Sequence, residues 1–490
     1  MAISTLRLLS NLIAEAVDAI EGTYTEAGVP LPRLDDPSPY DPTDPAEALR
    51  GHPVVEAATI NLVAAAAQIT ATARHPILSA LVDAHAFQIS SCLRTASELN
   101  VVEILRESGP QGLHANDIAV QSHADPGLLA RILRLLATHH IFQEVAPGVF
   151  ANNRISSTLD KGKPAALLFE RREDRLTDTA GIAAMVEFLG DDCFKSSAQL
   201  GDALLDPTGE QRPLARAMRT VEPMFQWFTR PENRYRGTRF GLAMHGSANA
   251  EPEGFLFKGY DWGSLPADAV VVDVGGGIGT TSMAIARNYP AFKVIVQDLP
   301  PTIEDAKAHW NQHFPEHVQS KMVELQGQFF SSVYRCHRFD FIPAHQVHNF
   351  FGPQPMQNAD VFMLRHIIHD WPDEKSIAIL KHLREAAKPT TQLIIIENII
   401  PVVSEGESDD PKINSVPGAM RKAAPAPLLP NFGVSNASMY LFDLTVHNML
   451  GGVERTVRGF YDLLNESGWE LVRVYRCPGS EKCHIVGVPK

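Results

Sequence analysis

The sequence predicts an α/β protein with a parallel sheet in its C-terminal half, preceded by a helical region that ends in a winged-helix outline. Short, almost continuous apolar runs indicate strands buried on both faces, and they occur at 269–274, 292–298, 359–368 and 392–400. Helical patterns follow the first and third runs, and this alternation is typical of a parallel sheet with helices on both faces. The final segments WELVRVYR and KCHIVGV flank PGSE, which predicts an antiparallel strand pair at the end of the sheet.

The composition is that of a globular protein with a sizeable core. The chain has 490 residues, of which 44% are apolar and 20% are charged. Its 43 basic and 57 acidic side chains give a net charge of −14, which argues against a nucleic acid or an anionic membrane as the main partner. Five cysteines in this length make neither a disulfide framework nor a metal-binding cluster. We therefore expect reduced thiols and a cytoplasmic protein.

Residues 1–76 are predicted to hold two helices joined by a linker. The pattern of 4–22 is that of an amphipathic helix and not of a signal peptide. Residues 29–47 are rich in proline and aspartate and predict an extended linker, and an alanine-rich helix follows at 48–73. The longest apolar stretch, Ala57–Thr70, is shorter than the roughly 18–20 residues of a membrane span. No catalytic residue type stands out in these helices. We therefore expect them to serve in packing, including packing against a second subunit.

Residues 77–160 predict three helices followed by a hairpin, which is the outline of a winged helix. The hairpin is indicated by IFQEVAPGVFANN, which turns at Pro147 and Gly148. One interpretation is DNA binding through Arg131 and Arg134 on the third helix, and the other is a dimerisation or substrate-lid module. The net negative charge and the scattered arginines favour the second interpretation.

A glycine-rich turn, DVGGGIG, lies between the first buried strand and its helix. Glycines there let a ligand approach the backbone and leave the N–H groups of the helix free to bind it. Asp298 ends the next strand, where a carboxylate can accept hydrogen bonds from both hydroxyls of a ribose. Gly275 and Gly277 are followed by Thr280 rather than by the last glycine of a dinucleotide fingerprint. The pattern indicates an adenosine-bearing cofactor, and it fits S-adenosylmethionine better than a nicotinamide dinucleotide.

The sequence His369-Asp370-Trp371 follows the third predicted strand, and Glu397 lies at the end of the fourth. Ligands bind at this carboxyl edge of open parallel sheets. Methyl transfer to a phenol requires removal of a proton, because phenols have a pKa near 10, and a neutral imidazole can accept it. A carboxylate on the other ring nitrogen would fix the tautomer and stabilise the imidazolium.

In combination, these motifs resemble the caffeic-acid-type small-molecule O-methyltransferases. The likeness is carried by VVDVGGGIG, VIVQDLP, ADVFMLRHIIHDWPDE, LIIIENIIP and GGVERT, and the likeness to fungal members by RPENRYRGTRFGLAM, KGYDWGSLP and PLLPNFGVSNASMYLFDLTVHNMLGG. The resemblance implies a winged-helix-like dimerisation domain at 77–160 and a Rossmann-like class I catalytic domain at 263–490. Residues 161–262 would be a helical linker that contributes to the acceptor pocket, and 1–76 would be N-terminal helices and linker.

The resemblance also implies a function: transfer of a methyl group from S-adenosylmethionine to a hydroxyl, most simply phenolic, of a small aromatic compound in secondary metabolism. S-adenosylhomocysteine (SAH) is the expected product. The resemblance implies a homodimer and no metal. No nucleic acid and no membrane are expected as partners.

The resemblance assigns roles to individual residues. Gly275 and Gly277 would lie on the methionine and ribose side of the cofactor, Asp298 on the ribose, and Leu299 near the adenine. Arg365 is at a position where the family often has a Lys or Arg that contacts the cofactor.

The catalytic assignments follow from the same motifs. His369 would be the general base, and Glu397 and Glu454 would flank and orient it. The acceptor pocket would be lined by Phe240, Met244, Thr445 and Met449, and an apolar, aromatic wall suits a flat phenol.

Two segments depart from the family pattern. The family has an Asp-Phe-Phe-like element near the adenine, whereas Asn349-Phe350-Phe351 is the best placed match here, with Gln328-Phe329-Phe330 as a competitor. The stretch 327–346 has no counterpart in the family pattern, and we interpret it as an insertion and hypothesise an unspliced intron. A second extra stretch, 403–424, is predicted to be a flexible surface loop.

Three alternatives stay open at this point. A nicotinamide-dependent oxidoreductase is disfavoured by Thr280. A winged-helix regulator with an inactive methyltransferase-like domain is disfavoured by the retained His369, Glu397 and Glu454. A metal-assisted catechol methyltransferase is disfavoured because no cluster of carboxylates is evident at the site.

Overall fold

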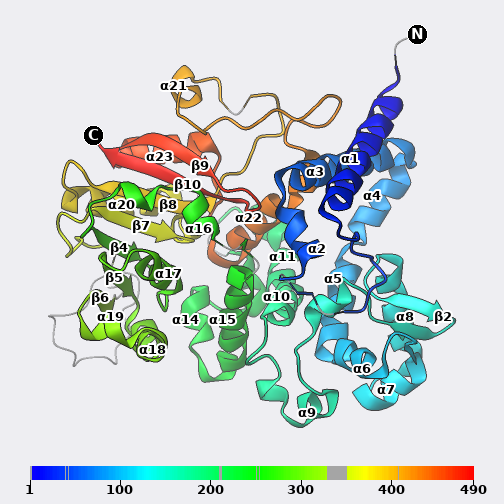
Figure 1. Ribbon diagram of the computed structural model, residues 1–490. Helices are drawn as coiled ribbons and strands as arrows, with labels where there is room; N and C mark the ends of the chain where they lie inside the picture. The colour runs from blue at the N-terminus through cyan, green and yellow to red at the C-terminus, as the bar shows by residue number, and fades with distance from the viewer. Residues whose placement is uncertain are drawn as a thin grey trace. The chain divides into compact units, whose positions relative to one another are not determined.

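The computed structural model describes residues 3–490 except 39, 42, 209–211, 250, 253, 328–349 and 407. The chain forms two compact units (Figure 1). Unit 1 comprises Met1–Pro252 with the short segments Phe432–Ser435 and Asn448–Leu450. Unit 2 comprises Glu253–Asn431, Asn436–His447 and Gly451–Lys490.

Unit 2 is built on a seven-stranded sheet in the order β6-β5-β4-β7-β8-β10-β9. The first five strands in this order are parallel, and β10 runs antiparallel to both β8 and β9. The bounds are β4 Val270–Val274, β5 Lys293–Asp298, β6 Val323–Gly327, β7 Val361–Arg365, β8 Gln392–Asn398, β9 Trp469–Arg476 and β10 Lys482–Pro489. The four predicted buried strands and the final antiparallel pair are confirmed, and β6 is an additional strand.

Helices cover both faces of this sheet (Figure 1). The side chains of a strand alternate between faces, so Val272 and Val274 join one apolar cluster and Val271 joins the other. The first cluster includes α20 (Asp373–Ala386) and α23 (Val457–Glu466), and the second includes α17 (Thr280–Asn288) and α18 (Pro300–His313). Burial on both faces explains the continuous apolar runs in the sequence. The remaining helices of unit 2 are α16 Phe255–Lys258, α19 Pro315–Gln319, α21 Pro411–Asn414 and most of α22 Ala437–Leu450.

The stretch 403–424 differs from the predicted flexible loop, because parts of it pack on unit 2. Ile413 of α21 is fully buried in the sheet core, as is Ala419. The backbone N–H of Val474 on β9 donates to Pro417, and Arg476 donates to the carbonyls of Gly418 and Ala419. The sequence analysis missed these buried residues because the acidic segment SEGESDD that precedes them is typical of an exposed loop.

Unit 1 contains the predicted winged-helix outline, with four helices rather than the predicted three packed against the wing. Its helices α5 Phe87–Glu98, α6 Val101–Ser108, α7 Ala115–Ser122 and α8 Pro126–Thr138 enclose one apolar cluster with the wing. The wing is a three-stranded sheet in the order β1-β3-β2, with bounds β1 Leu113–His114, β2 Gln143–Ala146 and β3 Val149–Ala151. Asp125 caps α8 by accepting from the N–H of Leu128 at 2.6 Å.

The N-terminal helices are α1 (Thr5–Ala27), α2 (Pro45–Ala48), α3 (Pro53–Ala73) and α4 (Pro76–Ala84). Helix α1 ends at Gly28, which adopts the left-handed conformation that glycine accepts. Helix α3 is long enough and apolar enough to span a membrane when judged by length and composition alone, although the sequence analysis found no such run. No other helix in the part of the chain that the structure describes is both long enough and apolar enough.

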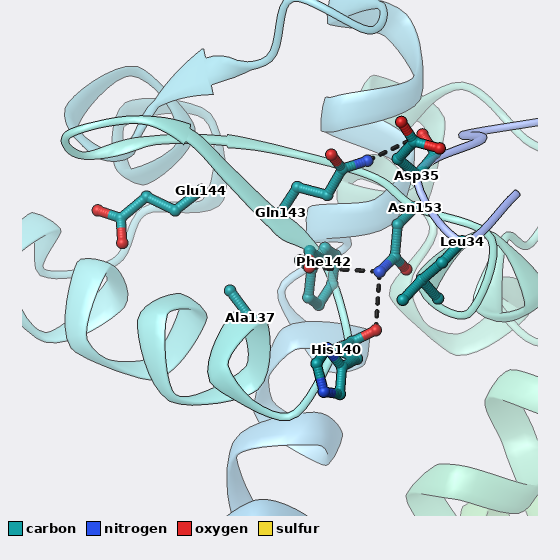
Figure 2. A pocket seen from close by; sticks show the side chains of 8 residues that line it. All are labelled: Leu34, Asp35, Ala137, His140, Phe142, Gln143, Glu144 and Asn153. Atoms are coloured by element: carbon teal, nitrogen blue, oxygen red, sulfur yellow. Dashed lines mark hydrogen bonds between the residues drawn. The ribbon is translucent and has the colours of Figure 1, made fainter. Parts of the chain in front are cut away.

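The linker rich in proline and aspartate attaches to the wing. Figure 2 shows the pocket at this junction, where the Gln143 side chain donates to the carbonyl of Asp35 at 2.9 Å. Asn153, which follows β3, donates to the carbonyls of His140 and Phe142 and so ties the segment before β2 to the segment after β3. The lining residues are Leu34, Asp35, Ala137, His140, Phe142, Gln143, Glu144 and Asn153.

The rest of unit 1 is helical, as predicted. The helices are α9 Ala165–Glu170, α10 Ile182–Phe188, α11 Phe194–Ser197, α12 Leu200–Leu204, α13 Pro213–Met218, α14 Met224–Phe228 and α15 Arg234–Asn249. Helices α10 and α15 pack closely, because Gly181 and Gly246 bring their backbones together. Arg239 of α15 is buried and bonds Asp191 at 2.7 Å and Asp192 at 2.8 Å.

Candidate active site

The glycine turn joins β4 to α17 at the carboxyl edge of the sheet. Gly275, Gly277 and Gly279 all have positive φ, which favours glycine over other residues. The N–H groups of Gly275 and Gly276 donate to the carbonyl of Gln297 at 2.7 and 3.1 Å, which fixes the turn against β5. A Cβ on Gly277 would have no atom within 4 Å, so the turn presents open backbone there.

Asp298 closes this turn from the end of β5. Its Oδ2 accepts the N–H of Gly277 at 2.8 Å, and its Oδ1 accepts the N–H of Leu299 at 2.6 Å. Burial raises the pKa of Asp298. The structure therefore brings together Gly275, Gly277, Asp298 and Leu299, as the sequence analysis expected for a cofactor site.

Arg365 ends β7 beside the same turn. Its guanidinium donates to the hydroxyl of Thr281 in the first turn of α17 at 2.7 Å and lies over the ring of Phe255. Burial lowers the pKa of Arg365, while the nearby Asp273 raises it. The side chain thus lies on the cofactor side of the sheet edge.

The aromatic element near the predicted adenine site is described only in part. Asn349 lies outside the described residues, as do Gln328-Phe329-Phe330 and nearly all of 327–346. Phe350 is buried and packs against Phe351 and Trp371, with ring centres 4.9 and 6.1 Å apart. Its predicted contact with the adenine stays a prediction.

His369 lies in a single 3-10 turn, Ile368–Asp370, directly after β7. Only 4% of the residue is exposed. The Nδ1–H of its ring donates to Oε1 of Glu454, and its Nε2 lies 3.5 Å from Oδ1 of Asp370. Phe442 of α22 packs against the ring, with centres 5.7 Å apart.

Glu454 reaches His369 from the loop GGVERT. Gly452 allows this approach, because a Cβ there would lie 2.0 Å from the carbonyl oxygen of His369. The N–H of Val453 donates to that same oxygen at 2.8 Å. Asp443 of α22 accepts the N–H of Glu454 at 2.8 Å and so ties the loop to the helix.

Glu397 acts on the backbone around His369 and not through a hydrogen bond to its ring. Its Oε1 accepts the N–H groups of Ile367, Ile368 and His369 at 3.1, 2.6 and 3.1 Å. The resemblance implied that Glu397 and Glu454 both flank and orient the imidazole. In the structure Glu454 bonds the ring, and Glu397 holds the turn that carries it.

Arg455 holds the same turn from the other side. It donates to the carbonyls of Ile368 and Trp371 at 3.0 and 2.9 Å and to the hydroxyl of Ser376 at 3.1 Å. The sequence reasoning gave no role to this residue, although it lies inside the GGVERT motif. It also missed Phe442 and Asp443, whose sequence positions carry no recognisable signal.

The charges in this cluster shift each other's pKa values. Burial lowers the pKa of His369, but Asp370, the hydrogen bond to Glu454 and the charge of Glu397 outweigh it and raise the pKa to about 10. Burial raises the pKa of Asp370 to about 6 and that of Glu397 to about 7. An imidazole enclosed by carboxylates is well suited to hold a proton taken from a ligand.

The four residues predicted to line the acceptor pocket are divided between the units. Phe240 and Met449 belong to one apolar cluster of unit 1, where Phe240 packs edge-on against Phe188 and Phe225. Met244 is exposed on α15. Thr445 belongs to unit 2, and its hydroxyl donates to the carbonyl of Leu441 within α22.

Comparison with known proteins identifies the families and relatives to which this chain is similar. Residues 82–162 match the O-methyltransferase dimerisation domain, and residues 256–339 and 340–420 match the O-methyltransferase domain. The chain is 38% identical to an O-methyltransferase of Armillaria gallica over 99% of both chains. It is 37% identical to 4-O-methyltransferase 1 of Phanerochaete chrysosporium over 96% of both chains.

A solved structure shares the fold. The crystal structure of OxaC in complex with SAH and oxaline has a TM-score of 0.61 and 20% sequence identity. The match covers 98% of this chain and 100% of that one. At this level of identity the likeness concerns the fold alone.

Proposed function

The chain belongs to the O-methyltransferase family with an N-terminal dimerisation domain, and we propose that it transfers a methyl group from S-adenosylmethionine to a phenolic hydroxyl of a small aromatic compound. The observation that carries the proposal is the buried pair of His369 and Glu454 at the sheet edge that also holds the glycine turn and Asp298. Family membership removes the nicotinamide oxidoreductase from consideration.

The glycine turn fits the proposed cofactor. Gly277 presents open backbone beside the Asp298 carboxylate, whose oxygens already face the turn. Gly275, Gly277, Asp298, Leu299 and Arg365 would hold the cofactor, with Asp298 on the ribose hydroxyls. When bound, S-adenosylmethionine supplies an electrophilic methyl group on a positively charged sulfur.

The residues of the chain would manage the proton. His369 would accept it from the acceptor hydroxyl at Nε2, because Nδ1 is committed to Glu454. Only the neutral imidazole can accept this proton, and the neighbouring carboxylates raise the pKa of His369 to about 10, so we expect turnover to rise as the pH approaches that value. Glu454 would stabilise the imidazolium that forms, and Glu397 and Arg455 would keep the turn in place.

Replacing His369 by Ala tests this role. We expect methyl transfer to a panel of phenols, followed with a labelled methyl donor, to fall by roughly 10²–10⁴-fold while calorimetric SAH binding stays near normal. His313→Ala, on the exposed end of α18, is the control. Unchanged turnover of H369A would contradict the role as base. Binding of SAH by the wild-type protein without any turnover would favour the inactive regulator.

The proposal includes a homodimer, no metal ion and a cytoplasmic location. Among the described residues, no group of three or more His, Cys, Asp or Glu is arranged to hold a metal. Chelator-resistant activity tests the metal-independent mechanism, and light scattering tests the oligomeric state.

A further inference from the structure

Gln297 of β5 is a polar residue enclosed in the core, directly before Asp298, the residue expected to bind the ribose. Its exposed fraction is 0%. Side chains two residues apart in a strand lie on the same face, so Gln297 shares a face with Ile295, which belongs to the same apolar cluster as Phe350. A buried amide is costly unless its hydrogen bonds are made. The partners of Gln297 therefore show which segments it connects.

The side chain of Gln297 forms a reciprocal amide pair with Gln354. Nε2 of Gln297 donates to Oε1 of Gln354 at 2.9 Å, and Nε2 of Gln354 donates back to Oε1 of Gln297 at 3.0 Å. Gln354 is also buried, and its Oε1 accepts the N–H of Met356 at 3.1 Å as well. Nε2 of Gln297 has a second acceptor in Oε1 of Gln326, near the end of β6, at 2.8 Å. The pair thus ties the loop that contains Gln354 to two strands of the sheet.

The backbone of Gln297 holds a different part of the predicted cofactor site. Its carbonyl is the group that accepts the N–H groups of Gly275 and Gly276 and so fixes the glycine turn. Asp298, which accepts from the next residue of that turn, is bonded to Gln297 through the peptide chain. One buried residue therefore joins the glycine turn and the predicted ribose residue to the loop of Gln354.

The loop of Gln354 carries the aromatic element that is predicted to lie near the adenine. Phe350 and Phe351 are its described residues, and Gln354 follows Phe351 by three positions. The two rings pack against Trp371, with centres 6.1 and 4.9 Å from it. Ring contacts of this kind tolerate sliding, whereas two reciprocal hydrogen bonds require one alignment of both amides. The amide pair therefore sets the position of the aromatic element relative to β5.

We propose that Gln297 and Gln354 are positioning residues that hold the aromatic element and Asp298 at the separation needed to bind the adenosine half of S-adenosylmethionine. The inference rests on the proposed function. Neither amide is assigned a contact with the cofactor, because each is committed to the other. Loss of the pair should therefore weaken every ligand that contains adenosine, whatever is attached to its 5′ carbon.

Two substitutions of Gln354 test the pair through calorimetric SAH binding. Gln354→Met keeps the length of the side chain and removes the amide, so we expect SAH affinity to fall by about tenfold at every pH. Gln354→Glu can restore the pair in one protonation state, because a neutral carboxyl has a donor and an acceptor, as an amide does, whereas an ionised carboxylate only accepts. Burial favours the neutral form. Q354E should therefore bind SAH within a few-fold of the wild type at about pH 5.5 and about tenfold more weakly at about pH 8.

Two controls separate this role from a general loss of stability. Wild-type protein measured at each pH accounts for the ionisation of other groups near the site, among them Asp298 and His382, whose Nε2 lies 3.0 Å from the carbonyl oxygen of Phe351. Asn153→Ala removes a buried amide of the wing in unit 1, which donates to two carbonyls. N153A should lower the free energy of unfolding and leave SAH affinity unchanged.

A fragment of the cofactor localises the effect. 5′-Methylthioadenosine contains the adenosine half without the amino acid, and its affinity can be measured by competition with SAH. We expect Q354M to lose affinity for this fragment and for SAH by the same factor. A loss for SAH alone would place the effect in the methionine half and overturn the inference.

The remaining outcomes distinguish the inference from the proposed function. If Q354M binds SAH as the wild type does, or if the affinity of Q354E follows that of the wild type at both pH values, the inference is overturned while the function stays intact. If the wild type does not bind SAH, the proposed function fails and takes the inference with it. If Q354M does not fold, Q354E decides, because its two protonation states are compared within one protein.

Discussion

The Nδ1–H of buried His369 donates its hydrogen bond to a carboxylate from a loop 85 residues further along the chain, that of Glu454. This bond assigns the tautomer of the neutral ring, because it leaves Nε2 as the nitrogen that can accept a proton once the imidazolium has lost one. The loop is anchored in turn by Asp443 through the N–H of Glu454. The position of one proton therefore depends on residues from three segments of unit 2.

Glu454→Gln should lower both the rate of methyl transfer and the pH at which it rises. The carboxylate raises the pKa of His369, so its removal makes the imidazole neutral at lower pH. It also removes the charge that stabilises the imidazolium. We expect the acid limb of the kcat/KM profile to move to lower pH by about one unit or more, with a lower plateau. An acid limb at the wild-type position would show that Glu454 does not act on the titrating group.

The glycine turn and Asp298 can be tested without an acceptor. Asp298→Ala removes the carboxylate that accepts from Gly277 and Leu299, so the turn loses a support as well as the predicted ribose contact. Calorimetry should show SAH affinity lowered by at least about 10-fold, while Asp298→Asn, which keeps one acceptor oxygen, loses less. Asp305→Ala, exposed on α18, should bind normally. Normal SAH affinity of D298A would exclude Asp298 from the site.

The sequence predicted most of this sheet because its central strands are buried on both faces. It did not predict β6, an edge strand whose sequence VELQG includes Glu324, which pairs with Lys293 at its exposed margin. Its alternation of polar and apolar residues is too short to separate from a loop. The apolar length of α3 was also underestimated, because the sequence analysis counted only Ala57–Thr70 and left out the residues at both ends of the helix.

The motifs placed the candidate residues at the carboxyl edge of the sheet, where the structure has them, but did not assign their contacts. Both Glu397 and Glu454 were expected near the imidazole, and tertiary structure alone reveals that one bonds the ring and the other the backbone. Arg455 directly follows Glu454 in the sequence, and His366 directly follows Arg365. Their contacts depend on loop conformation, which residue spacing does not specify.

Arg455→Ala should destabilise the protein and reduce activity by disordering the turn around His369. Loss of the guanidinium removes its hydrogen bonds to the buried carbonyl of Ile368 and to the carbonyl of Trp371, which costs about 2 kcal/mol or more. Arg458→Ala, three residues on in α23 and half exposed, should change the free energy of unfolding by less than about 0.5 kcal/mol. Chemical denaturation measures both, and equal effects of the two variants would contradict the role of Arg455.

The pH dependence of stability should contain a contribution from His369. Its pKa is raised above 6.5 to about 10 in the folded protein, so the fold favours the protonated ring. The stability that this provides is fully present below about pH 6.5 and is lost as the pH rises through 10. His369→Gln should therefore flatten the fall in Tm across this range, relative to the wild type. Parallel curves for the two proteins would show that the ring is not protonated in the fold.

The apolar surface of α4 provides the test of the dimer. Ile77, Leu78, Leu81 and Val82 are 65, 52, 53 and 40% exposed, and no residue of this helix is buried within the chain. A helix with such a face normally covers it against a partner, and α4 extends into the match with the dimerisation domain at residue 82. A charge at this face would be buried unpaired in a dimer, so L78E/L81E should shift the protein to monomers in multi-angle light scattering. Val120→Glu, 74% exposed on α7, is the control and should remain dimeric. A double variant that stays fully dimeric at low micromolar concentration would place the interface elsewhere on unit 1.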